Sequence, residues 1–143
     1  MFVHDPLDLL RFEHAVIRLR FSIAQEILDQ NPQQGLSLLW ETHSFVVGWH
    51  ARIEDKYVFP LLGDKAKPFS NDHLLIDKYG TSAISQGRKD WIQRYVKIVL
   101  DHNLNEEEKL FVEPLNLSGL WNEILEEIKR YSDYTKITGM RVK

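Results

Sequence analysis

The chain has 143 residues, a net charge of −3 and no cysteine. Without cysteine it cannot form disulfides, thiolate metal sites or iron–sulfur clusters, so any metal must be held by histidine and carboxylate side chains. The small acidic charge gives no sign of a nucleic-acid partner, and no run approaches the ~18 apolar residues of a membrane span. Because the first residues also lack the basic-then-apolar order of a signal peptide, we expect a cytoplasmic protein that binds neither nucleic acid nor membrane.

Helices are predicted almost throughout, because apolar residues recur every three or four positions from Leu7 onwards. Residues typical of turns interrupt this pattern at 31–35, 62–68 and 85–88. Such short connections make neighbouring helices antiparallel, which predicts an all-α fold: an up-down-up-down four-helix bundle over about residues 5–113. An additional C-terminal helix is expected at about 116–134, within a single domain of residues 1–143.

Helix starts are expected at three places: at Asp5 with Pro6, at Ser70 and at Asp90. The last helix should follow Pro114 and carry a broad apolar face around Trp121, which would also suit a homodimer formed through this helix. The tail from Thr135 is expected to be frayed, and His4 is expected to be exposed.

Two stretches of the sequence, 50–61 and 102–115, resemble each other. Each begins with a histidine that is followed four residues later by a glutamate, as His50 and Glu54 or as His102 and Glu106. In each, a second acid comes directly after the glutamate, a phenylalanine follows the histidine by nine residues, and Pro-Leu ends the stretch. The likeness indicates an internal repeat that places the same chemistry twice.

The polar members of this repeat interrupt stripes of apolar residues that should face the interior, as do His14 and His73. In an antiparallel pair of helices, residues equidistant from the turn lie at the same height. The midpoints between the successive polar positions all fall within the predicted turns, so four histidines and two glutamates should converge. Burying unpaired charges costs several kcal/mol, which metal coordination can offset. The set suits two ions bridged by the glutamates.

These residues resemble the hemerythrin family in its broader form, the HHE cation-binding domain, over about residues 7–115. The resemblance rests on the order of His14, the His50/Glu54 pair, His73 and the His102/Glu106 pair. It implies a non-haem di-iron centre of two iron ions, oxo- or hydroxo-bridged, with the four histidines as terminal ligands and the two glutamates as bridges. It also implies that the protein binds or senses O2, another small diatomic molecule or peroxide, or handles iron.

The sequence departs from the oxygen-carrying hemerythrins at Asp77, where they have a second histidine four residues after that of the third helix. Asp77 is expected on the inward face, either as a direct ligand or as a carboxylate that holds water or a ligand in place. His43, seven residues before His50, is expected to support the ligands or the core, with ligation the less favoured role. Gly80 either leaves room for a diatomic ligand or permits a close helix contact. The remaining acids near the cluster are expected to be solvated: Glu13, Asp55 and Glu107.

Two other functions remain open at this stage. A ferritin-like di-iron oxidase or peroxidase would use Glu-x-x-His on two helices, and the chain contains no such motif. A helical interaction module would use its metal only to stabilise the fold. Gly-rich phosphate loops and nucleophile motifs are missing, and no catalytic side chain is identified. We therefore expect a metal- and oxygen-binding protein rather than an enzyme.

Overall fold

The structure, a computed structural model, describes residues 5–112, 115 and 117–141. Every regular element within these residues is helical, which confirms the predicted all-α class. Among them, none of the helices combines the length and the hydropathy that a membrane span requires. His4, Pro114 and the predicted boundaries at 113 and 116 lie outside the described residues.

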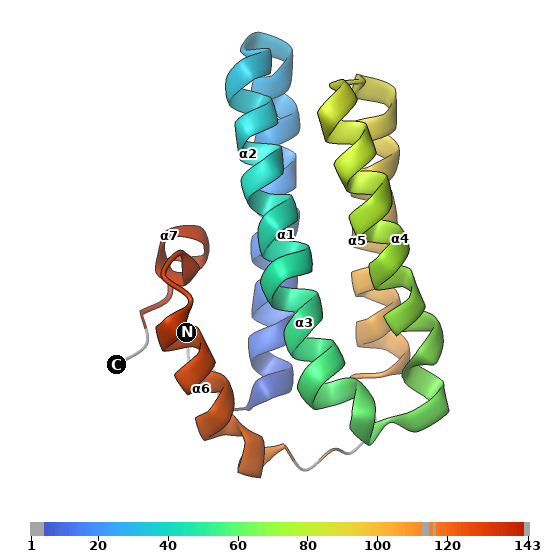
Figure 1. Cartoon of the computed structure of the whole chain (residues 1–143), viewed down its shortest axis with the longest axis vertical. Helices are drawn as coiled ribbons and strands as arrows, with labels where there is room; N and C mark the ends of the chain where they lie inside the picture. Colours follow the sequence, from blue (N-terminus) through green and yellow to red (C-terminus); the bar gives the residue numbers. More distant parts are fainter. Residues whose placement is uncertain (1–4, 113–114, 116, 142–143) are drawn as a thin grey trace.

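Four long helical stretches lie side by side and alternate in direction (Figure 1). The second begins as α2 and continues without a turn through two π-helical segments and a short α-helix. The stretches are α1 (Pro6–Gln30), then α2 (Pro32–Phe45) with η1 (Val46–His50), α3 (Ala51–Ile53) and η2 (Glu54–Val58), then α4 (Lys67–Gln86) and α5 (Lys89–Lys109). Helix α1 contacts α2 and α5, and α4 contacts the same two helices, so the four enclose a common interior.

The first helix starts as predicted. Asp5 caps α1 by accepting a hydrogen bond from the backbone N–H of Asp8 at 3.0 Å, and Pro6 occupies the first turn. The predicted break at 31–35 is too long, because Asn31 alone separates α1 from α2. Its side chain accepts from the N–H of Gln34 at 3.2 Å, so one residue both ends one helix and caps the next.

The next two connections also differ from the prediction: the second lies earlier in the chain, at 59–66, and the third is shorter, at 87–88. Two 3₁₀ turns, η3 (Phe59–Leu61) and η4 (Gly63–Ala66), fill the second connection, and α4 therefore begins at Lys67 rather than at Ser70. At the third connection, Gly87 ends α4 in the left-handed conformation with φ of 63°, which glycine adopts without strain. Helix α5 then begins at Lys89, one residue before the predicted Asp90.

The π-helical turns η1 and η2 were not predicted from the sequence, because apolar spacing does not distinguish a π turn from an α turn. His50 is the last residue of η1, and Glu54 is the first residue of η2. A π turn adds one residue to the hydrogen-bonded loop and is found most often at functional sites. Both candidate ligands of the second stretch therefore lie where the helix departs from regular α geometry.

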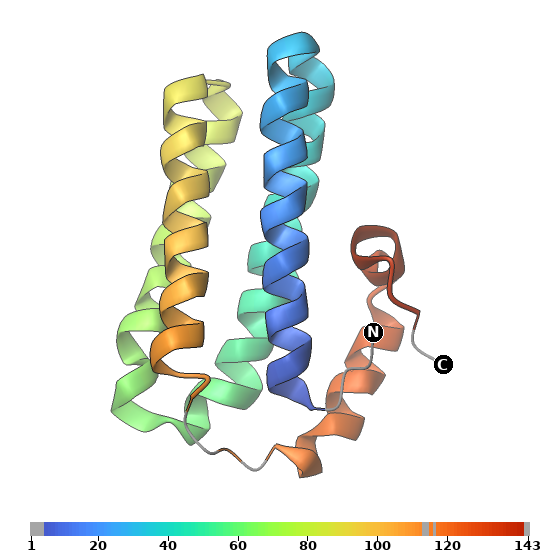
Figure 2. The ribbon, with the colours of Figure 1, turned by 180° about the vertical axis from the view of Figure 1, so that it is seen from behind.

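Helices α6 (Trp121–Arg130) and α7 (Tyr134–Thr138) lie beside the four long stretches (Figure 2). Glu127 of α6 pairs with Arg52 of α3, and α7 contacts α1. The prediction of a frayed tail from Thr135 was wrong, because α7 is helical and buries Tyr134 and Ile137. On α6, Ile124 and Ile128 are buried within this chain. Part of the face predicted for a homodimer therefore packs internally, and dimerisation itself stays a prediction.

Gly80 on α4 permits a close helix contact. A Cβ atom at this position would lie 2.5 Å from ring atoms of both His43 and Tyr95. We expect Gly80→Ala to destabilise the protein by about 1–3 kcal/mol in chemical denaturation, because these buried rings must shift. Gly48→Ala is the matched control: it is also helical, but nothing lies within 4 Å of its added methyl group. It should be neutral or stabilising by about 0.5–1 kcal/mol, and equal effects of the two variants would contradict this explanation.

Candidate metal centre

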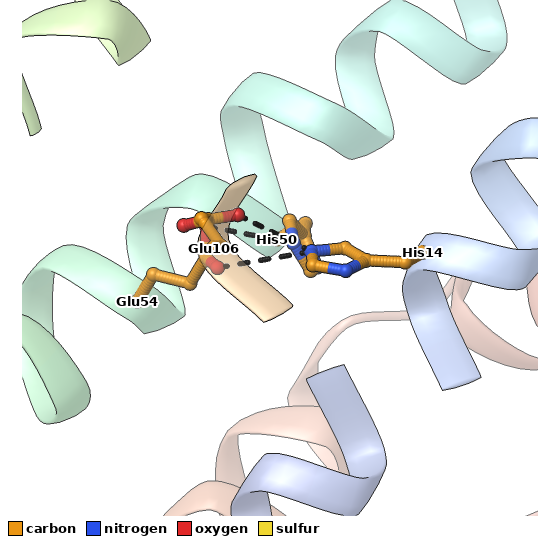
Figure 3. A group of neighbouring side chains, drawn as sticks. All are labelled: His14, His50, Glu54 and Glu106. Carbon is orange, nitrogen blue, oxygen red and sulfur yellow. Dashed lines mark ion pairs between the residues drawn. The ribbon is translucent and has the colours of Figure 1, made fainter. Parts of the chain in front are cut away.

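The structure brings six of the predicted site residues together in the interior, and we call them the cluster: His14, His50, Glu54, His73, His102 and Glu106. They form two overlapping groups whose potential ligand atoms lie within 4.8 Å of one another. Figure 3 shows the first group, in which His14 and His50 meet both glutamates. The second group contains the other two histidines and the same two glutamates. All six side chains are buried.

The carboxylate of Glu54 lies between the two pairs of histidines. Its Oε1 is 3.4 Å from Nε2 of His50 and 3.2 Å from Nε2 of His73, which belongs to the other group. Its Oε2 is 3.9 Å from Nε2 of His14. One carboxylate therefore faces histidines from α1, α4 and its own helical stretch.

Glu106 on α5 occupies a similar place. Its Oε1 lies 3.3 Å from Nε2 of His14 and 3.4 Å from Nε2 of His102. It too faces one histidine from each group, so both glutamates are shared between the groups. A carboxylate has two oxygens and can contact two ions, whereas a neutral imidazole offers one lone pair.

Nine buried atoms of the cluster have no hydrogen-bond partner among the described residues. Eight of them are the potential inner ligand atoms, Nε2 of each histidine and both carboxylate oxygens of Glu54 and Glu106, and the ninth is Nδ1 of His14. Leaving a buried polar atom unpaired costs roughly 1–3 kcal/mol, so eight at one place require a compensating group. Imidazole nitrogen and carboxylate oxygen are good ligands for divalent first-row metals. The donor set therefore fits a pair of cations held between four histidines and two shared carboxylates.

The outer nitrogen of His50 is held by Glu13, an acid that the sequence analysis expected to be solvated. Glu13 is fully buried and accepts from His50 Nδ1 at 2.8 Å, from Trp49 Nε1 at 2.8 Å and from the hydroxyl of Tyr134 at 2.6 Å. The expectation failed because α7 and Trp49 cover this side of α1. With Nδ1 donating to the carboxylate, Nε2 is directed inward and offers its lone pair there once it is deprotonated.

The other three histidines also have an acid at their outer nitrogen. Asp55 accepts from His73 Nδ1 at 2.9 Å, and Asp72 accepts from His102 Nδ1 at 3.1 Å. For the remaining histidine, His14, the nearest acid is Glu107, whose Oε2 lies 3.4 Å from Nδ1. Asp55 and Glu107 are partly exposed, as expected, and each also faces a histidine of the cluster.

The internal repeat accounts for half of these contacts. In each copy of the repeat, the acid after the glutamate and the phenylalanine nine residues after the histidine contact one and the same imidazole of another helical stretch. This imidazole is His73 for the first copy and His14 for the second. Phe59 stacks on His73, with ring centroids 5.3 Å apart, and Phe111 stacks on His14 at 5.7 Å. The other two acids, Glu13 and Asp72, directly precede His14 and His73 in the sequence. An acid-histidine dipeptide on both the first and the third helical stretch was the signal that could have found them.

The family model for the hemerythrin HHE cation binding domain matches residues 5–113, a segment that contains the whole cluster. The chain belongs to this family. Comparisons with curated proteins and with solved structures found no match. The family is described as cation-binding, in agreement with the eight unpartnered inner ligand atoms of the cluster.

Asp77 and His43 do not join the cluster of this hemerythrin domain. The prediction that Asp77 faces inward was wrong, because its side chain is 61% exposed and lies 3.5 Å from Nε2 of His43. Asp77 lies about 40° to one side of His73 around the helix and Ile76 about 60° to the other, and α4 is turned so that the side with Ile76 faces the interior. The neighbouring Ile76 takes the inward position instead. His43 is buried, and its Nε2 also lies 3.3 Å from the hydroxyl of Thr81.

Two histidines of the hemerythrin cluster hold protons strongly in the metal-free protein. Burial by itself lowers the pKa of His50, but Glu54 and Glu13 outweigh burial and raise the pKa to about 10. At His73, burial is likewise outweighed by Asp55 and Glu54, which raise the pKa to about 9. Both imidazoles are therefore charged at neutral pH when no metal is bound.

The pKa values of the other titratable groups of the cluster are also shifted, some upwards and some downwards. Burial lowers the pKa of both His14 and His102, so these imidazoles are neutral at pH 7. Burial raises the pKa of Glu106 well above its usual range, and the nearby charge of Glu54 raises it further. Burial also acts against ionisation of Glu54, but the charge of His50 prevails and holds its pKa well below the usual range.

Metal binding to this hemerythrin domain should release protons. Ligation requires unprotonated Nε2 atoms, so His50 and His73 must each give up a proton, about two per chain at pH 7. Because protons compete with the ions, the apparent affinity should rise as the pH rises towards the pKa values of His73 and His50. Titration calorimetry in buffers of different ionisation enthalpy measures this release. Identical heats in all buffers would contradict the prediction.

Proposed function

We propose that this hemerythrin HHE domain binds two iron ions in the cluster and uses them to bind or sense O2 or a related small molecule, such as another diatomic or peroxide. The observation that carries the proposal is the set of eight buried, unpartnered nitrogen and oxygen atoms that face one another. His14 and His50 would hold one ion, and His73 and His102 the other. Glu54 and Glu106 would contact both.

The iron, when bound, supplies reversible redox chemistry, and the protein supplies orientation and a dry interior. Glu13, Asp55 and Asp72 accept hydrogen bonds from Nδ1 and so keep the Nε2 atoms of three histidines directed inward. Phe59 and Phe111 stack on two of the histidines and restrict the access of water to them. These contacts support a site whose ligands are positioned before the metal arrives.

We further propose that the four long helical stretches form the up-down-up-down bundle of a single domain, with α6 and α7 as a C-terminal addition. The antiparallel course of the stretches and the burial of Ile124, Ile128 and Tyr134 support this description. A cytoplasmic location stays a prediction, which cell fractionation would test.

The first test is metal content combined with visible absorption. We expect close to two iron ions per chain after anaerobic reconstitution, and an absorption change when O2, nitric oxide or hydrogen peroxide is added to the reduced protein. Zinc-loaded protein is the control, because zinc is not redox-active and should show no change. A chain that takes up only traces of iron would overturn the proposal. Continuous consumption of O2 or peroxide would instead favour the oxidase or peroxidase alternative, and metal binding without any response would favour a structural metal.

A further inference from the structure

A second layer of buried residues lies above the cluster. Each helical stretch contributes one residue to this layer, and each of these residues is seven positions from the cluster histidine of its own stretch. On every stretch, the seven positions lead away from the end near α6. The four residues are Phe21, His43, Gly80 and Tyr95. Seven residues of α-helix rise about 10 Å, so this layer lies roughly two turns from the cluster. Tyr95 and His102 share helix α5, and His43 and His50 share the second stretch.

Tyr95 and His43 form a buried pair at the centre of this layer. The side chain of Tyr95 is fully buried, and its hydroxyl forms a hydrogen bond with Nδ1 of His43. Phe21 meets the tyrosine ring edge-on at 5.5 Å. Gly80 permits the arrangement, because a Cβ atom there would collide with both rings of the pair. Residues of all four helical stretches therefore combine to hold one phenol against one imidazole in the interior.

His43 also connects this pair to the surface. Its Nε2 lies 3.3 Å from the hydroxyl of Thr81 and 3.5 Å from the exposed carboxylate of Asp77. The ring of Trp40 meets His43 edge-on at 6.0 Å and is 37% exposed. Polar and aromatic groups thus follow one another from the buried phenol to solvent.

The pair is in the protonation state that a proton transfer from Tyr95 to His43 requires. Burial raises the pKa of Tyr95, and the charge of Asp77 raises it further, so the phenol keeps its proton at neutral pH. Burial lowers the pKa of His43, which leaves the imidazole neutral. Nε2 of His43 faces the Asp77 carboxylate, which can only accept, so we assign the proton of the neutral imidazole to Nε2 and the acceptor role towards the phenol to Nδ1.

We propose that Tyr95 is a redox-active residue that gives one electron to the oxidised metal centre while its proton passes to Nδ1 of His43. This inference rests on the proposed function, because the metal centre is the immediate electron acceptor. The O–H bond of the phenol breaks and an N–H bond of the imidazole forms, so a neutral tyrosyl radical remains beside an imidazolium. Thr81 and Asp77 face the new positive charge.

Hydrogen peroxide is the oxidant that balances this step. It takes up two electrons and two protons to become two molecules of water. One electron comes from Tyr95 and the other from the metal centre, and the two protons come from solvent. A one-electron reductant that acts at the exposed side of Trp40, together with return of the proton from His43, then restores the phenol.

The test is electron paramagnetic resonance of the iron-loaded protein, frozen shortly after mixing with one equivalent of hydrogen peroxide. We expect an organic radical whose spectrum changes when the protein is prepared with ring-deuterated tyrosine. Tyr95→Phe should lose this signal, whereas Tyr79→Phe, which removes a half-buried tyrosine of α4, should keep it. His43→Gln should lower the yield of the radical while Tyr95 is retained. In deuterium oxide the radical should form more slowly, since a proton moves with the electron.

Two results would overturn the inference: an undiminished tyrosyl signal in Tyr95→Phe, or oxidation of the iron by peroxide without any tyrosyl signal in the native protein. Iron content and circular dichroism of each variant separate loss of the radical from loss of the site or of the fold. If the native chain takes up no iron, the proposed function and this inference fail together. If it takes up iron and reacts without a radical, only this inference fails.

Discussion

Glu54→Ala and Glu106→Ala should each lose more than one of the two metal ions. Each carboxylate faces histidines of both groups, so its removal takes a ligand from both ions at once. His14→Ala should mainly weaken one ion, because an imidazole nitrogen serves a single metal. Metal content after gel filtration in a metal-free buffer measures the difference. A glutamate variant that keeps two tightly bound ions would show that the carboxylates are not shared.

Three consecutive glutamates on α5 provide a matched series for this measurement. Glu106 is fully buried, Glu107 is partly exposed and contacts His14 of the cluster, and Glu108 is exposed. We expect Glu106→Ala to lose more than one ion, Glu107→Ala to weaken one ion, and Glu108→Ala to leave the metal content unchanged. The same loss in all three would indicate a general effect on α5 instead of ligation.

Glu13→Gln should both weaken metal binding and destabilise the protein. Glu13 accepts from three donors, and the amide nitrogen of glutamine would face at least one of them. Disturbing a carboxylate that orients a ligating histidine typically lowers the metal affinity roughly 10–100-fold, and we expect a loss in this range for Glu13→Gln. Loss of one partner of a buried charge pair destabilises by about 3–5 kcal/mol. Metal competition and chemical denaturation of the metal-free protein measure the two effects separately.

Two further variants separate the effect of Glu13 on stability from its effect on metal binding. Tyr134→Phe removes one donor to Glu13 without touching His50, so it should lower stability by about 1–3 kcal/mol and keep both ions. Asp72→Asn changes the acid at His102, which lies at the partly exposed edge of the site. It should weaken metal binding with little loss of stability. If Glu13→Gln keeps native affinity for metal, then the contact with His50 is only structural.

The position of the cluster could be predicted because it depends on two regular quantities. Helical periodicity showed that His14, His73 and the two His-Glu pairs interrupt inward stripes, and the turn residues showed that these positions lie at one height. Small errors in the turns, such as the start of α4 at Lys67 instead of Ser70, did not alter this result. A shift of a helix start by a few residues does not change which face of that helix points inward.

The sequence by itself determined the helical class, the family and the six residues that meet in the interior, because these follow from local periodicity and from the order of the motifs along the chain. Only the tertiary structure decided which acids hold the histidines and where Asp77 points. Glu13 is buried by Tyr134, a residue 121 positions away, and no local pattern predicts such a contact. Asp77 lies at the edge of the inward face of α4, so the rotation of α4 against α2 decides whether its side chain is buried or exposed. Contacts between distant segments are set by packing of the whole chain, and periodicity within one helix does not specify them.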